Sequence, residues 1–100
     1  MTRREVLAWL DSRRPPPPAV LRAHLEALVS DSDERLPEHL AELGSAVLGR
    51  VTGAPGEGRA LALDLLAADA FVTYAFEAQA EADVRGLAVL AKGVAGGGTI

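Results

Sequence analysis

The chain has 100 residues, enough for one hydrophobic core and too few for two. Apolar residues are 49% of the sequence but aromatic residues only 4%, because Ala and Leu supply most of the hydrophobicity, and this favours closely packed helices. The net charge of −4 argues against a nucleic-acid partner, and the lack of Cys excludes disulfides, thiolate chemistry and Cys-ligated zinc.

The first predicted helix runs from Thr2 to about Arg13. Thr2 and Glu5 have the spacing of a capping box, in which each side chain accepts a hydrogen bond from the other residue's backbone N–H. We expect Trp9 to anchor this helix in the core, and a helix lying on a membrane surface is the alternative. The apolar run at 6–10 is too short for a signal peptide or a membrane span.

Four consecutive prolines at 15–18 are predicted to end this helix and to form a stiff corner, because Pro fixes φ and lacks a backbone N–H. A polyproline ligand for an SH3-type domain is the alternative. The second helix is predicted from about Pro18 to Ser30, with His24 on or beside its apolar face. We expect His24 to be half-exposed or hydrogen-bonded, since no second metal ligand lies one turn away.

The acidic turn at 30–34 is predicted to cap a third helix, which runs from about Asp33 or Leu36 to Thr52. Gly44 lies in the middle of this helix, where it costs about 1 kcal/mol relative to Ala. We expect the close approach of another helix to explain this glycine.

The stretch from about Glu57 to Ala82 is predicted to be a long central helix, because its apolar residues cover nearly every side. The sector that we expect to be buried contains Leu61, Leu65, Ala68, Val72, Ala75 and Phe76. The opposite sector contains Leu63, Leu66, Ala67, Ala70 and Tyr74. Beyond Phe76 polar residues interrupted only by Ala predominate, and we expect that half to emerge into solvent.

Asp64 breaks the pattern of the central helix, since it lies beside an apolar face. We expect this acid to be buried or paired with an Arg such as Arg50 or Arg59, or else to be exposed in the first turns of the helix. A catalytic or ligand-binding acid is the alternative, although the sequence shows no second member of such a site.

Asp69, Glu77 and Glu81 form an acidic ridge on the same helix. Like charges one turn apart repel weakly, so either solvent or Arg side chains from another helix must offset them. Metal binding is the alternative, and His24 and His39 are the only imidazoles in the sequence.

The central helix is expected to break near Asp83, with a last helix over about 84–94. Residues 1–95 then make one helical domain, and residues 96–100 make a flexible Gly-rich tail. The predicted fold is all-α, a compact four- or five-helix bundle around the long apolar helix at about 57–82.

These features predict a small non-catalytic protein that acts in protein–protein interaction or as a homo-oligomeric adaptor, most simply a dimer. The candidate interface residues are Leu63, Leu66 and Tyr74, because the preceding helices leave part of the central helix uncovered. The alternative is a small enzyme or metal-binding protein that uses Asp64, or the acidic ridge, with a His. We expect no cofactor and a cytoplasmic location, and the Ala- and Arg-rich composition suggests a bacterial source.

Overall fold

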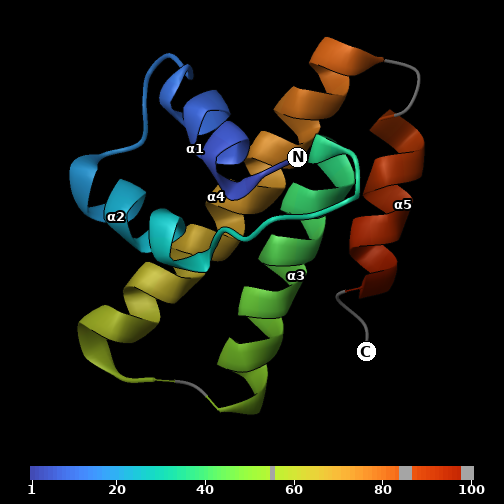
Figure 1. Cartoon of the computed structure of the whole chain (residues 1–100). Helices are drawn as coiled ribbons and strands as arrows, with labels where there is room; N and C mark the ends of the chain where they lie inside the picture. The colour runs from blue at the N-terminus through green and yellow to red at the C-terminus, as the bar shows by residue number, and fades with distance from the viewer. Residues whose placement is uncertain (55, 84–86, 98–100) are drawn as a thin grey trace.

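The computed structural model describes residues 1–54, 56–83 and 87–97, which form five helices and no strand. The helices are α1 (Arg3–Asp11), α2 (Ala19–Leu28), α3 (Leu36–Gly53), α4 (Gly58–Ala82) and α5 (Leu87–Gly97). Figure 1 shows α4 crossing the molecule beside α3, with the other helices packed around this pair. The predictions of an all-α fold and a long central helix are confirmed.

α4 ends at Ala82, and Asp83 has an extended conformation, which is the break predicted near this residue. α5 runs through Gly97 and so includes the first two residues of the predicted tail. The predicted start of the last helix at Val84 and the tail residues 98–100 lie outside the described residues. Within the described ranges no helix combines the length and the apolar character that a bilayer span requires.

The start of α1 has the predicted capping box. The Glu5 N–H donates to Thr2 Oγ1 at 3.2 Å, and the Thr2 N–H donates to Glu5 Oε1 at 2.9 Å. The helix ends at Asp11, and the prolines at 15–18 lead the chain to α2, as predicted for a stiff corner.

The linker between α2 and α3 holds the N-terminal end of α1. The Arg3 N–H donates to Asp31 Oδ1 at 2.5 Å, and the Ser32 N–H donates to the Met1 carbonyl at 3.0 Å. The prediction that this acidic turn caps the following helix is therefore wrong, because Asp31 caps α1 instead. The N-cap of α3 is Arg35, which makes no side-chain cap.

Gly44 allows α3 to pack closely against α4. A Cβ atom on Gly44 would lie 2.9 Å from Val72 Cγ2 and 3.3 Å from both the Ala68 carbonyl oxygen and Phe71 Cβ. The shortest of these distances is below the closest approach that carbon atoms make in packed proteins. The expectation that another helix approaches Gly44 is confirmed.

The buried face of α4 consists mainly of small residues. It contains Ala67, Ala68, Phe71, Ala75, Ala78 and Gln79. Phe71 is fully buried, and the other fully buried large side chains come from α1, α2 and α3: Val6, Leu10, Leu25 and Leu40. The core therefore lies where these three helices meet the Ala-rich face of α4.

The prediction that Leu65 lies in the core is wrong, because this side chain is 46% exposed. Helical geometry turns Leu65 about 120° away from the fully buried Phe71. The close α3–α4 contact leaves space for Ala on the shared face, so Leu65 points outward. Val72, which was expected to be buried with it, is half-buried.

The prediction that the second half of α4 emerges into solvent is also wrong. Ala78 is 4% exposed and Gln79 is 3% exposed. The Gln79 Nε2 group donates to the Asp83 carbonyl at 2.7 Å, so its buried amide has an acceptor. The inward side of this half therefore remains part of the core, while Glu77, Ala80, Glu81 and Ala82 are exposed.

The Gly44 contact is tested by a pair of Gly→Ala substitutions in α3. We expect Gly44→Ala to destabilise the protein by about 1–3 kcal/mol. The added methyl group forces a helix to move, and the cost of this movement exceeds the gain of about 1 kcal/mol in helix propensity. Gly49→Ala is the control, since a Cβ there would meet no atom within 4 Å. It should stabilise by about 0.5–1 kcal/mol. Urea denaturation measures both values, and equal stabilisation by the two substitutions would contradict the close contact.

Candidate functional site

Asp64 accepts hydrogen bonds from two other helices. Its Oδ1 atom lies 2.8 Å from His24 Nε2 on α2 and 3.4 Å from Arg50 Nη2 on α3. The side chains of Asp64 and His24 are 22% and 27% exposed. This half-buried carboxylate therefore links α2 and α3 to α4.

The His24–Asp64 pair resembles the arrangement in which a carboxylate orients an imidazole for general-base catalysis. Such a site needs a nucleophile or a metal ion beside the imidazole. Among the residues that the structure describes, no group of three or more His, Asp or Glu is placed to hold a metal ion. The sequence predicts an Arg partner for Asp64 and gives a His partner as the alternative, without indicating which of the two imidazoles it is.

His39 is buried and has a backbone partner. It is 4% exposed, and its Nε2 atom lies 2.9 Å from the Ser30 carbonyl oxygen. Because a carbonyl only accepts hydrogen bonds, this contact assigns the proton to Nε2. His39 thus ties α3 to the segment that follows α2, and this contact gives it a structural role.

Arg13 offsets two members of the acidic ridge. Its Nη1 atom lies 2.6 Å from Glu81 Oε2 and 3.7 Å from Glu77 Oε2. The Trp9 Nε1–H donates to Glu81 Oε1 at 3.1 Å. The hydrogen bond from Arg13, and then that from Trp9, lowers the pKa of Glu81. The third member, Asp69, is exposed.

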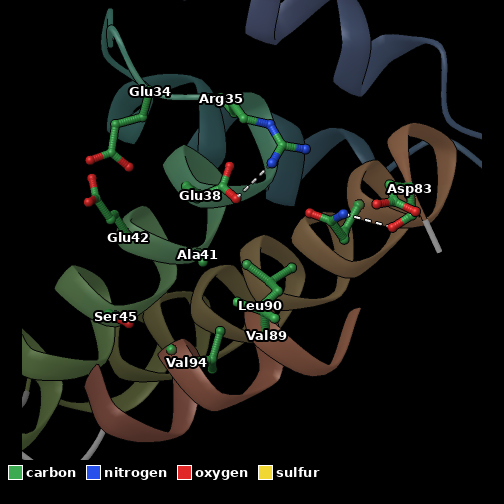
Figure 2. Close-up of a pocket in the computed structure, with 12 residues that line it drawn as sticks. Glu34, Arg35, Glu38, Ala41, Glu42, Ser45, Asp83, Val89, Leu90 and Val94 are labelled. Atoms are coloured by element: carbon green, nitrogen blue, oxygen red, sulfur yellow. Dashed lines mark hydrogen bonds and ion pairs between the residues drawn. The ribbon is translucent and has the colours of Figure 1, made fainter. Parts of the chain in front are cut away.

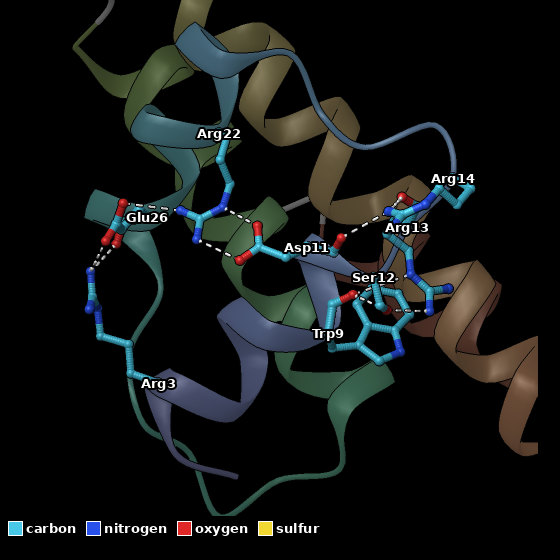
Figure 3. Close-up of polar contacts among 8 residues, drawn as sticks. All are labelled: Arg3, Trp9, Asp11, Ser12, Arg13, Arg14, Arg22 and Glu26. Atoms are coloured by element: carbon cyan, nitrogen blue, oxygen red, sulfur yellow. Dashed lines mark hydrogen bonds and ion pairs between the residues drawn. The ribbon is translucent and has the colours of Figure 1, made fainter.

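Trp9 anchors α1 against α4, which is the role predicted for it. The ring is half-buried, packs against the core, and meets the Tyr74 ring edge-on at a centroid distance of 6.0 Å. The Arg13 guanidinium lies over the Trp9 ring at 3.8 Å from the ring centroid. Figure 3 shows Trp9 and Arg13 together. These contacts leave the indole little free surface for a membrane.

A second set of ion pairs joins α1 to α2, as Figure 3 shows. The Arg22 guanidinium donates to both carboxylate oxygens of Asp11, at 2.7 and 3.1 Å, and to Glu26 at 3.0 Å. The hydrogen bond from Arg22 lowers the pKa of Asp11. This network fixes how the two short helices sit together.

A pocket of about 560 Å³ lies between α3 and α5 (Figure 2). One wall carries carboxylates at the start of α3 and just before it, and the other wall carries apolar side chains of α5: Glu34, Glu38 and Glu42 face Val89, Leu90 and Val94. The volume is within the range of small-molecule sites. The sequence did not indicate this pocket, because it depends on where α5 packs.

The outward face of α4 exposes two neighbouring leucines. Leu65 is 46% exposed and Leu66 is 52% exposed. Of the other candidate interface residues, Leu63 and Tyr74 are half-buried, and Tyr74 already packs against Trp9. Leu66 is therefore the most accessible of the three residues that the sequence proposes for an interface.

The chain matches no family model, no curated protein and no solved structure. The sites above are thus distinguished by their geometry and chemistry. Two of them leave chemical groups open to a partner: the leucine face of α4 and the pocket beside α5.

The Arg13–Glu81 contact predicts a pH dependence of stability. The folded pKa of Glu81 is depressed, so its contribution is present above the unfolded pKa of about 4.3 and is lost as the pH falls through the folded pKa. Between pH 6 and pH 3, the free energy of unfolding of Glu81→Gln should therefore fall less than that of the unsubstituted protein. Urea denaturation followed by circular dichroism measures this. Asp33→Asn, at an exposed acid without an ion pair in the described structure, is the control and should preserve the original dependence.

Proposed function

We propose that the protein is a small non-catalytic interaction protein that self-associates as a homodimer through the outward face of α4. The observation that supports this proposal most directly is the exposure of Leu65 and Leu66, side by side on the longest helix. A single exposed leucine is ordinary, but adjacent leucines turned about 100° apart make a broad apolar surface. A two-fold partner is the commonest way to bury such a surface.

Charged residues on the same helix favour a second copy of this chain as the partner. Arg59 and Asp69 lie on either side of the two leucines and are exposed, and within the described parts of the chain neither has an ion pair. They are ten residues, or about 15 Å, apart along the helix axis. Opposite charges at equal distances from a midpoint are self-complementary across a two-fold axis.

The proposed dimer pairs two α4 helices in antiparallel orientation. With the two-fold axis level with Asp64, Arg59 of one protomer faces Asp69 of the partner subunit. Leu65 and Leu66 lie within two residues of this level, so they occupy the centre of the interface. Charged pairs at the rim and apolar side chains in the centre are the usual composition of a protein interface.

A cytoplasmic location is part of this proposal, since a chain without Cys gains nothing from an oxidising compartment. The net charge of −4 supports a protein partner over a nucleic acid. The composition, rich in Ala and Arg, supports a bacterial source.

The dimer is tested by light scattering coupled to size exclusion at micromolar concentration. We expect the mass of two chains for the unsubstituted protein and the mass of one chain for Leu66→Glu, because a buried unpaired carboxylate opposes association. Val20→Glu is the control: Val20 is 53% exposed and lies on α2 and not on α4, so this change should leave the dimer intact. A mass of one chain for the unsubstituted protein at every dilution would refute the proposal.

A charge swap tests the antiparallel arrangement itself. Arg59→Glu should weaken the dimer, because it places two acids opposite one another at each end of the interface. The double variant Arg59→Glu with Asp69→Arg restores opposite charges and should recover dimerisation. If Arg59→Glu weakens the dimer and the double variant does not recover it, the two residues do not meet.

One observation favours a second candidate function, the metal-binding protein or small enzyme that uses Asp64 with a His. This observation is the 2.8 Å contact between Asp64 and His24. Metal analysis of the purified protein, with a Zn²⁺ titration of the protein and of His24→Gln, separates the two candidates. We expect no stoichiometric metal. A bound transition metal that is lost in His24→Gln would replace the interaction proposal.

A further inference from the structure

The pocket between α3 and α5 has two chemically different walls. Carboxylates at the N-terminal end of α3 form one wall, and the α5 side chains Val89 and Val94 form much of the other, as Figure 2 shows. Val89 is 75% exposed, so its side chain lies open at the pocket and has little protein cover. A ligand that fits both walls must carry positive charge and an apolar body.

The carboxylate wall is short of hydrogen-bond donors. Glu38 Oε2 is buried and has no hydrogen-bond partner within the described residues. Among the described residues, the ion pair of this wall joins Glu38 Oε1 to Arg35 Nη1 at 3.5 Å, and the side chains of Arg35 and Glu38 are 61% and 40% exposed. Glu38 Oε2 therefore remains an acceptor for a cationic donor that enters the pocket.

Glu34 and Glu42 add to this demand for a cation. The pKa of Glu34 is raised, first by a hydrogen bond with the neighbouring Glu42 carboxyl and second by burial. Figure 2 shows the two carboxyl groups pointing toward one another at the side of the pocket. A positive charge placed beside them relieves the repulsion that disfavours two ionised groups at this distance.

The arrangement of the acids favours an organic cation over a metal ion. In the described part of the chain, no three acidic or imidazole groups are close enough together to coordinate a metal. An ammonium group needs only one or two acceptors, and its alkyl chain gains from contact with apolar side chains. The volume of about 560 Å³ suits a small molecule.

We propose that this pocket binds a small alkylammonium ion, with the ammonium group donating to Glu38 and Glu42 and the alkyl chain lying against Val89, Leu90 and Val94. The site is separate from the outward face of α4, so it does not rest on the proposed dimer. Failure of either proposal leaves the other standing.

Isothermal titration with three matched six-carbon probes tests the charge requirement. Hexylammonium, hexan-1-ol and hexanoate share an alkyl chain and differ in head-group charge. We expect saturable binding of one hexylammonium per chain, at least about tenfold weaker binding of hexanol, and no binding of hexanoate. Equal affinity for hexylammonium and hexanol would overturn the proposal, because the carboxylates would then contribute nothing.

Substitutions of single acids locate the site. Glu38→Gln and Glu42→Gln should each weaken hexylammonium binding by about tenfold, since each removes a charged acceptor. Glu57→Gln is the matched control: it removes the same charge from the start of α4, outside the pocket lining, and should leave the affinity unchanged. An equal loss of affinity in Glu57→Gln would mean that the cation responds only to net charge, which would overturn the site.

The apolar wall is tested by Val89→Ser, a change at an exposed position that should not affect folding. It should reduce the affinity for hexylammonium. The affinity for ethylammonium should stay unchanged, because its chain is too short to gain much from this wall. Circular dichroism and the mass in solution are measured for every variant, so that loss of binding is separated from unfolding or from a changed oligomeric state. If neither Val89→Ser nor Glu38→Gln altered the affinity for hexylammonium, the assignment of the two walls would be overturned.

Discussion

The contact between Gly44 and α4 is the constraint on which the remaining packing depends. Without a Cβ, this residue lets α3 meet the backbone and small side chains of α4 directly. The shared face then has room for Ala, with Phe71 as the one large apolar side chain among its buried residues. The leucines of α4 must point elsewhere, so the contact that forms the core also puts Leu65 and Leu66 at the surface. The absence of a side chain at Gly44 therefore explains both the packing of the core and the exposure of the candidate interface.

The elements of the fold could be predicted from the sequence because their signals are local. The capping box at Thr2 and the proline run at 15–18 act within a few residues, and Gly44 signalled a close approach. The buried direction of α4 could not be predicted, since a helix that is apolar on most sides does not show which side its neighbours occupy. For the same reason the sequence did not reveal that His24 meets Asp64, or that α5 closes a pocket.

The arginines and the acids are distributed unevenly over the molecule. Arg13, Arg22 and Arg50 each pair with a carboxylate on another helix, so they hold the helices together. Among the described residues, the acids at the start of α3 have one ion-pair partner, the exposed Arg35. Part of the negative charge is thus gathered beside the apolar wall of α5. This combination of acids and apolar side chains favours a cation with an apolar body at this pocket.

The surroundings of Trp9 give the molecule a built-in optical reporter. It is the only Trp in the chain, and its indole contacts a guanidinium on one side, a tyrosine edge on another, and a carboxylate at its N–H. The contacts with Tyr74 and Glu81 depend on α1 lying against α4, whereas Arg13 follows Trp9 by four residues in the chain. Indole emission therefore reports the docking of this one short helix, while circular dichroism reports the helix content of the whole chain. Comparing the two signals during denaturation shows whether α1 detaches before the α3–α4 pair separates.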